Sequence, residues 1–204
     1  MTERYRATLF GPDVRAAQSD MGTAHLWTRD LEARGDQTDR LGENEAAFIA
    51  ARDSFYIASN GNDGWPYLQH RGGPVGFLKV LDPGTLGFAD YRGNRQYVSL
   101  GNVVRDDRVS LFFMDYVRKA RLKLLGHMRA VDLAGDEALR ERLRDPDYPG
   151  RAERGFVIAV DAFEWNCPQH IAQRFTVEEM MPVLAPMQQR IDELEAQLAA
   201  LAPG

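Results

Sequence analysis

The chain has 204 residues, of which 44% are hydrophobic and 27% are charged. These proportions are typical of a soluble globular protein and allow one large domain or two small ones. Its 30 acidic residues outnumber 25 Lys and Arg, which is the opposite of the basic balance of a nucleic-acid-binding protein. Even the most apolar stretches, such as residues 109–114, are too short to span a membrane. The polar N-terminus lacks the apolar segment of a secretory signal peptide.

We therefore expect a cytoplasmic protein with neither a nucleic-acid nor a membrane partner. The single cysteine, Cys167, excludes an intramolecular disulfide and a cysteine-rich zinc site. The four histidines lie far apart in the sequence and lack the spacing of metal ligands, so we expect no metal site.

The first 42 residues are expected to form a helical or loop extension. Within this extension, the segment from Pro12 to Gly22 predicts a short helix. Residues 44–53 predict a second helix with Asn44 as its N-cap residue. The buried side of that second helix is expected to carry Phe48, Ile49 and Ala51.

Beyond residue 54 the chain changes to short aromatic and β-branched runs separated by turns rich in glycine and proline. This pattern predicts a meander of strands in a barrel or a sandwich. The expected strands are 55–59, 66–71, 75–81, 85–89, 108–116, 121–131 and 155–165.

Two helices are expected to interrupt the strands. The first spans 94–104, with Asn94 as N-cap candidate and with Tyr97, Leu100 and Val104 at helical spacing. The second lies within 135–146, with Asp136 as N-cap residue and Pro146 beyond its end.

The C-terminal segment 176–204 has a different pattern, which predicts a helix with Pro186 in its first turn. Its apolar residues are spaced 4, 3, 4 and 3, a seam of about two heptads formed by Met187, Ile191, Leu194, Leu198 and Leu201. This helix either packs on its own domain or pairs across a subunit interface. Two heptads are too short to decide between these alternatives.

The strand 121–131 predicts one apolar and one basic face. The apolar face is expected to carry Leu122, Leu124, Met128 and Ala130, and the basic face Arg121, Lys123, His127 and Arg129. The basic face is either a solvated surface or part of an anion pocket.

Two further segments favour an anion pocket. Arg92–Arg95, with the sequence RGNR, begins the helix predicted at 94–104, where free N–H groups and the helix dipole attract phosphate. Residues 69–73, QHRGG, end a strand and carry Arg71. A small anionic ligand could therefore gather Arg71, Arg95 and Arg121 from three separate elements.

Several segments in this order resemble the pyridoxamine 5′-phosphate oxidase-like FMN-binding proteins. They are GWPYLQHRGGPVGFLKVLD (64–82), TLGFADYRGNRQYVSLGNV (85–103), DDRVSLFFMDY (106–116), RLKLLGHMRAVD (121–132) and WNCPQHI (165–171). The resemblance is to the broad bacterial branch of oxidoreductase-like members, and it implies a split β-barrel domain over residues 43–175. It also implies a homodimer that holds FMN non-covalently between its subunits.

The resemblance further implies that Arg71 and Arg95, with Asn94 and Gln96 beside them, hold the FMN phosphate. It places Arg121 near the flavin ring, and residues between Trp165 and Arg174 against the flavin of the other subunit. The expected cofactor-binding residues are Gln69, His70, Arg71, Asp90, Asn94, Arg95, Gln96, Arg121, Trp165, Gln169 and Arg174. Lys79 matches a substrate-binding lysine of the family.

The sequence departs from the vitamin-pathway oxidase at the residues that hold the substrate phosphate. The helix DEALRERLRD (136–145) contains neither Tyr nor Ser, and NCPQHIAQR (166–174) stands where the oxidase has an Arg-x-His pair. We therefore expect little or no oxidation of pyridoxamine phosphate.

We expect instead an FMN-dependent oxidoreductase that transfers hydride or electrons from NAD(P)H to a small molecule. A flavin enzyme needs no catalytic triad, and the sequence contains none. The absence of GxGxxG implies that NAD(P)H docks over the flavin and not in a dinucleotide-binding domain of its own. The alternative is a non-enzymatic flavin or haem protein that acts as a carrier or sensor. RNA binding through exposed tyrosines is disfavoured by the net charge of −5.

Overall fold

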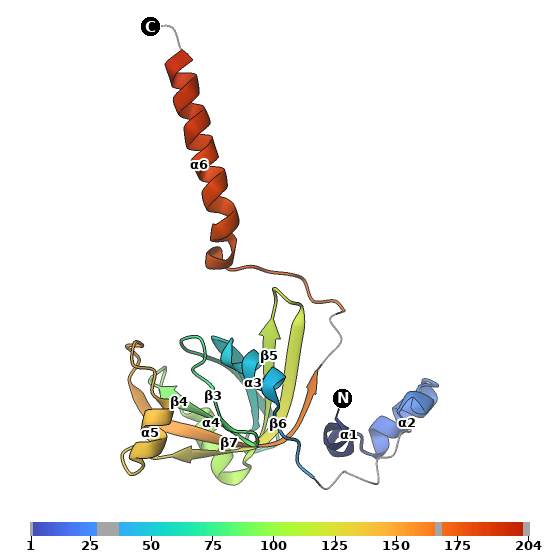
Figure 1. The fold of residues 1–204 in the computed structure, drawn as a ribbon. Helices are drawn as coiled ribbons and strands as arrows, with labels where there is room; N and C mark the ends of the chain where they lie inside the picture. Colours follow the sequence, from blue (N-terminus) through green and yellow to red (C-terminus); the bar gives the residue numbers. More distant parts are fainter. Residues whose placement is uncertain (1, 28–36, 166–168, 202–204) are drawn as a thin grey trace.

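The computed structural model describes residues 2–27, 37–165 and 169–201. Within these residues the chain forms an antiparallel sheet of seven strands with helices around it, as shown in Figure 1. The strands are β1 Ser54–Asn60, β2 Pro66–Gly72, β3 Lys79–Asp82, β4 Thr85–Tyr91, β5 Arg108–Asp115, β6 Ala120–Val131 and β7 Ala152–Trp165. The helices are α1 Glu3–Leu9, α2 Pro12–Asp20, η1 Ala24–Leu26, α3 Glu43–Ala50, α4 Val98–Arg105, α5 Glu137–Leu143 and α6 Val177–Leu201. The prediction of a mainly β fold with flanking helices and a C-terminal helix is confirmed. Cys167 lies outside the described residues.

The strands follow the order β2-β1-β5-β6-β7-β4-β3, so β2 and β3 are the two edges of the sheet. The sheet curls into a barrel that is split between these edges. The loop from β2 to β3 runs across the split and is fastened by N–H donors of Gly73 and Gly76 to carbonyl oxygens of Asp53 and Arg52, each at 2.9 Å. Gly76 has φ +77°, and a Cβ there would lie 3.0 Å from the Ala50 carbonyl oxygen. Only glycine fits this crossing without strain.

The core lies inside the curl and is built from aromatic side chains of several strands. Phe55 of β1 is central, because its ring lies 5.4–5.6 Å from the rings of Phe77, Phe88 and Phe113. All of these phenylalanines are buried. Burying each one stabilises the fold by about 1.5–3 kcal/mol.

The expected strand at 75–81 begins only at Lys79. Residues before it belong to the loop across the split, and they place Phe77 and Leu78 in the core without strand pairing. The apolar run therefore contributes Phe77 and Leu78 to the core, but its backbone before Lys79 is not a strand and Val75 is exposed.

The helix predicted at 44–53 is α3, and its N-cap is Gly42, not Asn44. The Gly42 N–H donates to Glu45 Oε2 at 2.9 Å. The Glu45 side chain thus reaches back from the first turn of the helix and satisfies the N–H group of the N-cap residue. Ile49 is buried as expected, whereas Ala51 follows the helix end and is exposed.

The helix predicted at 94–104 starts four residues later than expected, as α4. Arg95 and Tyr97 have φ of 63° and 54°, which an α-helix cannot accommodate. The Asn94 side chain accepts a hydrogen bond from the Gln96 N–H at 3.1 Å, forming a local turn that competes with the helix. The buried valine of α4 is Val103, whereas Val104 is exposed.

Two other helices were predicted from the sequence, and they are α5 and α6. Asp136 caps α5 by accepting from the Leu139 N–H at 2.9 Å, as expected. The C-terminal helix α6 begins at Val177, within the predicted segment 176–204, and Pro186 lies inside the helix and not in its first turn as expected. Thr176 and Glu179 form a reciprocal capping box, which defines the start at Val177.

Two residues of the basic face predicted on β6 lie against acidic residues of neighbouring elements. Lys123 pairs with Glu164 of β7 at 2.5 Å and lies 5.1 Å from the ring of Tyr5 in α1. Burial works to lower the pKa of Lys123, but the hydrogen bond and the charge of Glu164 together with contacts of Tyr5 outweigh it, so that pKa is raised. His127 lies 2.8 Å from Asp107. On the opposite face, Ala130 is exposed and not buried as expected.

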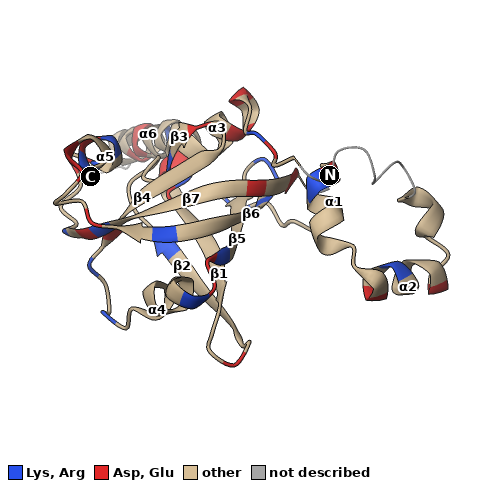
Figure 2. Cartoon of the chain, turned by 90° about the horizontal axis from the view of Figure 1, so that it is seen from below, with Lys and Arg blue, Asp and Glu red and all other residues tan. Residues whose placement is uncertain are grey.

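The N-terminal helix α1 is held on β7 by polar contacts. Arg4 pairs with Asp161 at 2.7 Å, and Thr2 Oγ1 donates to Asp39 at 2.5 Å. In Figure 2, α1 lies beside the end of the sheet, and α2 lies further out. Among the described residues, no helix is both long and apolar enough to cross a membrane.

Candidate functional site

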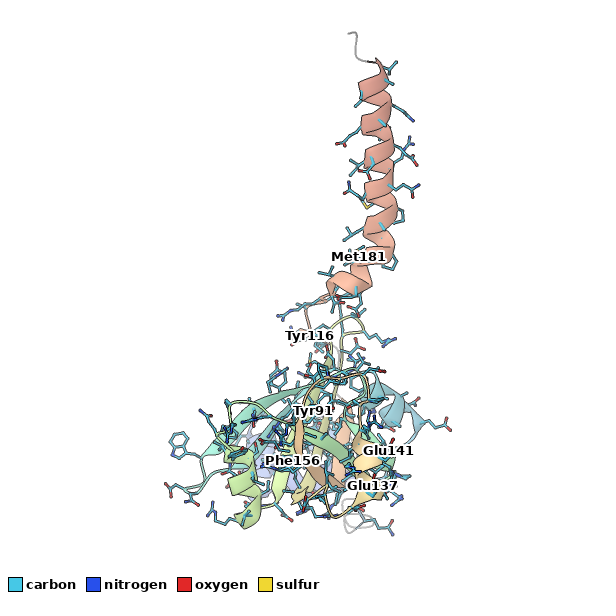
Figure 3. All side chains as sticks on the ribbon, turned by 90° about the vertical axis from the view of Figure 1, so that its left-hand side faces the viewer. Tyr91, Tyr116, Glu137, Glu141, Phe156 and Met181 are labelled. Atoms are coloured by element: carbon cyan, nitrogen blue, oxygen red, sulfur yellow. The ribbon has the colours of Figure 1, made fainter. Side chains whose placement is uncertain are left out.

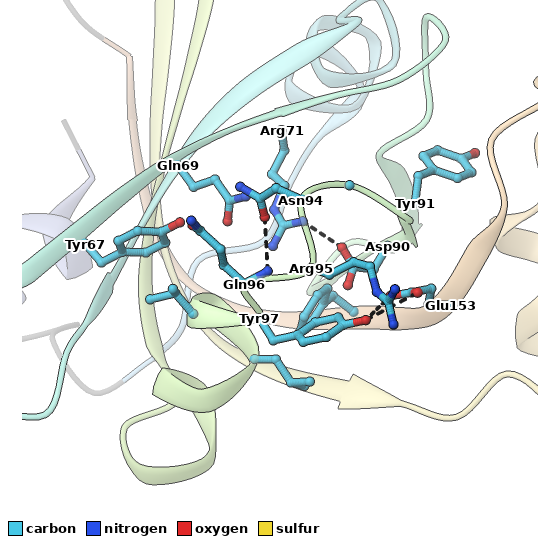
Figure 4. A pocket seen from close by; sticks show the side chains of 14 residues that line it. Tyr67, Gln69, Arg71, Asp90, Tyr91, Asn94, Arg95, Gln96, Tyr97 and Glu153 are labelled. Carbon is cyan, nitrogen blue, oxygen red and sulfur yellow. Dashed lines mark hydrogen bonds and ion pairs between the residues drawn. The ribbon is translucent and has the colours of Figure 1, made fainter.

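A cavity of about 130 Å³ lies between β2, β4 and the start of α4, closed by the loop 92–97 (Figure 4). The structure brings half of the expected site residues to its wall. These are Gln69, Arg71, Asp90, Asn94, Arg95 and Gln96.

The alternation of β2 selects which side chains face this cavity. Tyr67, Gln69 and Arg71 are half-buried and line it, whereas the residues between them are exposed on the other side. The buried Ser99 hydroxyl of α4 donates to Gln69 Oε1 at 2.9 Å. With its oxygen engaged in this way, the Gln69 amide has its nitrogen available as a donor to a ligand.

Arg71 is the most constrained cation of the cavity. Its Nη1 donates to Asp90 Oδ1 at 2.6 Å, and its guanidinium lies 5.6 Å from the ring centre of Phe156. Its Nε is buried and has no hydrogen-bond partner among the described residues. A buried donor left unsatisfied costs about 1–3 kcal/mol, so this site is suited to an additional acceptor.

Asp90 orients Arg71, although burial disfavours the charged form of the Asp90 carboxyl group. Burial raises the pKa of Asp90 above its usual value, and the neighbouring guanidinium groups of Arg71 and Arg154 act against that rise. Two carboxylates in this region face a larger number of cations: Asp90 and Glu153 against Arg71, Arg92, Arg95 and Arg154. The cavity wall itself is balanced, with Arg71 and Arg95 against Asp90 and Glu153, and the surplus comes from Arg92 and Arg154 beside it. A positive surplus around the cavity favours an anionic ligand.

The loop 92–97 has a strained backbone. Both Arg95 and Tyr97 adopt positive φ, which costs about 1–3 kcal/mol for each non-glycine residue. Contacts of Tyr97 hold the loop: its hydroxyl donates to Glu153 Oε2 at 3.1 Å, and the Arg154 guanidinium lies 4.9 Å from its ring centre. Such strain is concentrated at binding and catalytic sites.

The other expected site residues lie elsewhere in the chain. Lys79 Nζ is 2.5 Å from Asp145 Oδ1, and the Tyr91 hydroxyl donates to Asp145 Oδ2 at 2.7 Å. In addition, the ring of Tyr148 lies 4.7 Å from that of Tyr91. Lys79 therefore fastens the segment after α5 to the barrel within one chain.

His70 and Arg121 lie on the outer face of the sheet. His70 pairs in register with Tyr56, and Tyr56 pairs with Phe112, so these three side chains share one face. Arg121 lies 6.0 Å from the ring centre of Phe112, on that same face. Neither His70 nor Arg121 lines the cavity of its own chain.

The expected residues from the end of β7 onward lie at three further places. Trp165 Nε1 donates to Glu45 Oε1 at 2.6 Å, with its ring 4.7 Å from Phe48. Gln169 is exposed in a turn. Arg174 lies 4.8 Å from the ring of Tyr116 and lines a cavity of about 650 Å³ beside the β5–β6 hairpin.

Some residues of the site were not predicted from the sequence. Tyr67 shares the β2 alternation with Gln69 and Arg71, and this alternation could have identified it. Glu153 and Arg154 reach the site because β7 pairs with β4, with Arg154 opposite Asp90. No local pattern marks this pairing. No group of three or more potential metal ligands occurs within the described residues.

No curated protein matches the chain. The solved structures that are similar to it include a putative pyridoxamine 5′-phosphate oxidase from Lactobacillus delbrueckii, with 18% identity and a TM-score of 0.48. That similarity covers 63% of this chain and 97% of the other. An FMN-binding protein from Syntrophomonas wolfei is 11% identical, with a TM-score of 0.46 and coverage of 76% of this chain and 95% of the other. An F420 reductase is 18% identical, with a TM-score of 0.44 and coverage of 61% and 98%.

The comparison with family models is more direct. The model described as pyridoxamine 5′-phosphate oxidase matches residues 41–165, more than half of the chain. The matched range contains β1 to β7 and the whole wall of the 130 Å³ cavity. The chain belongs to the pyridoxamine 5′-phosphate oxidase family.

Proposed function

We propose that the protein is an FMN-dependent oxidoreductase that holds the FMN phosphate in the cavity between β2, β4 and α4. The observation that carries this proposal is the buried Nε of Arg71 in the cavity wall, which has no hydrogen-bond partner among the described residues. Family membership supports it, because the cavity is built from residues inside the matched range.

The donors of this cavity fit a phosphate dianion. Arg71 would donate from Nε, Gln69 from its amide nitrogen, and Arg95 from the exposed loop. Bonds between a guanidinium and phosphate oxygens are short and charge-assisted. Asp90 would repel a phosphate, so its role in this proposal is to orient Arg71 and not to contact the cofactor.

The remainder of FMN would lie outside this cavity, which is too small for three fused rings. We propose that a second copy of the chain covers the ring, by pairing through the outer face of β1, β2, β5 and β6. That face exposes Tyr56 (40%) and Leu68 (65%) and also carries Arg121. Arg121 of each copy would then serve the cofactor of the other.

When bound, FMN supplies the hydride- and electron-transfer chemistry that amino-acid side chains lack. The residues of the chain bind and orient the cofactor and exclude water. The proposed electron donor is NAD(P)H, which would dock transiently at the exposed ring.

Pyridoxamine phosphate is a poor candidate substrate. Lys79, the one residue that matches a substrate-binding lysine, is paired with Asp145. A substrate phosphate deprived of this lysine would lose the remote binding energy that aligns the reacting carbon.

The decisive experiment is the visible spectrum of the purified protein, followed by titration with FMN and anaerobic addition of NADH or NADPH. The proposal expects two flavin absorption bands and their bleaching by one of the nicotinamides. A protein that takes up no FMN contradicts the proposal. Binding without bleaching supports the carrier or sensor alternative, and efficient formation of pyridoxal phosphate contradicts the proposed substrate class.

A further inference from the structure

The helix α6 stands clear of the rest of the molecule. Figure 1 shows the helix projecting from the barrel, and Figure 3 shows that most of its length has side chains on every side with no other element beside them. None of its residues, all of which are described, is buried. Its segment before Thr176 is fastened to the β5–β6 hairpin, where Gln173 Nε2 donates to the Val117 carbonyl oxygen at 2.8 Å.

Because α6 begins at Val177, its apolar seam is twice as long as the two heptads visible in the sequence pattern from Met187. Positions a and d of four successive heptads are all apolar, and their spacing is unbroken. They are Val177, Met180, Leu184, Met187, Ile191, Leu194, Leu198 and Leu201. Seven of these eight are exposed, from 42% at Leu194 to 79% at Leu201.

The two prolines of α6 lie away from this seam. Both prolines, Pro182 and Pro186, fall at outer positions, f and c, where their rings face away from a partner helix. Two interior prolines and an apolar stripe with no partner in the core make α6 a poor helix by itself. It therefore requires a partner that covers the seam.

One pair of opposite charges favours a second copy in parallel orientation as the partner. Arg190 occupies a g position, and Glu195 occupies the e position five residues later. In a parallel coiled coil, g of one helix faces the following e of the other. In an antiparallel pair g faces g, and the g positions Val183, Arg190 and Gln197 contain no acid.

We propose that α6 pairs in parallel with α6 of a second copy, through the seam from Val177 to Leu201. Arg190 of each copy bonds to Glu195 of the partner subunit. Within its own helix Arg190 already bonds to Glu193 at 3.0 Å, and its five N–H donors allow a second carboxylate. The β-branched residues at two of the four a positions and leucine at two of the four d positions favour two strands.

Disulfide trapping in the full chain tests this pairing. Leu194→Cys places a thiol at a d position, next to its counterpart in a parallel pair. Gln189→Cys places a thiol at an outer f position and is the matched control. The parent chain shows how much crosslinking Cys167 gives by itself. We expect mild oxidation to convert the L194C protein to a covalent dimer and to leave Q189C at the level of the parent. An uncrosslinked L194C protein, or equal crosslinking of both variants, contradicts the proposal.

Charge reversal tests the orientation. The Arg190→Glu and Glu195→Arg variants each oppose like charges in their own dimers, whereas a mixed dimer restores both opposite-charge pairs. After unfolding and refolding together, differently tagged variants are expected to form mixed dimers in excess over random pairing. Random pairing would overturn the parallel register. It would favour an antiparallel pair of helices, a dimer formed by the barrels alone, or a different protein that covers the seam. Neither experiment depends on flavin, so a failure of the helix pairing is distinguishable from a failure of the proposed function.

Discussion

Arg71 and Asp90 are joined by a hydrogen bond of 2.6 Å between β2 and β4, strands that are not neighbours in the sheet. β2 is one edge of the sheet, and β4 lies next to the other edge. The pair therefore ties the two ends of the split barrel together beside the cavity, and it links the stability of the fold to the proposed cofactor site.

Replacing Arg71 with alanine is expected to weaken FMN binding at least about tenfold. A hydrogen bond to a charged group contributes about 1.5–3 kcal/mol, and Arg71 would make such bonds to the phosphate. Fluorescence titration of apoprotein measures the affinity. Arg129→Ala removes the same charge from an exposed position of β6 and is the matched control. Equal affinities for the two variants would refute the assignment of Arg71.

Asp90 is expected to give the folding stability a characteristic pH dependence. Burial raises its pKa above the ordinary value, so the folded state retains a proton that the unfolded chain releases. This contribution to stability is fully present below about pH 4 and is lost as pH rises through the raised pKa.

The measurement is urea unfolding of the wild type and of Asp90→Asn across this pH range. The difference in unfolding free energy, wild type minus variant, is expected to fall with rising pH and then to level off. Asp63→Asn, in the exposed turn before β2, controls for loss of a carboxylate. A difference that rises with pH would contradict the direction assigned to Asp90.

Lys79 and Asp145 are expected to act as a structural pair. Asp145→Ala leaves both Lys79 and the Tyr91 hydroxyl without their partner, and should cost about 2–3 kcal/mol of unfolding free energy. Lys79→Ala should cost less, and a double-mutant cycle should show a coupling of roughly 0.5–3 kcal/mol. Additive effects would show that the interaction between Lys79 and Asp145 contributes nothing to the unfolding free energy. FMN affinity should be unchanged in Lys79→Ala.

Two glycine-to-alanine substitutions are expected to have opposite effects. At Gly126 of β6 a Cβ would lie 2.6 Å from the Ala159 carbonyl oxygen and 2.8 Å from Ile158 Cγ2. This overpacking should destabilise the protein by about 1–3 kcal/mol. At Gly101 of α4 a Cβ would meet no described atom within 4 Å, so alanine should stabilise by about 0.5–1 kcal/mol. Chemical unfolding of both variants checks the sign of each effect.

The sequence by itself determined the features that depend on neighbouring residues. Alternation along β2 places Gln69 and Arg71 on one face, because successive side chains of a strand point to opposite sides. The cap of α5 at Asp136 is equally local. The resemblance carried by segments in a fixed order led to the correct family and barrel.

Only the tertiary structure decided which distant residues meet. Closure of the sheet brings Asp90 to Arg71, and it commits Lys79 to Asp145 and not to the cavity. The late start of α4 depends on positive φ at Arg95 and Tyr97, where contacts of Tyr97 with β7 stabilise a backbone that local preference disfavours. The sequence pattern from Met187 left the partner of the C-terminal helix open. The structure narrowed that question, because it showed α6 starting at Val177 with its whole seam outside the core. The physical reason is the same in each case: local patterns orient a side chain relative to its own backbone, whereas its partner depends on strand register and closure.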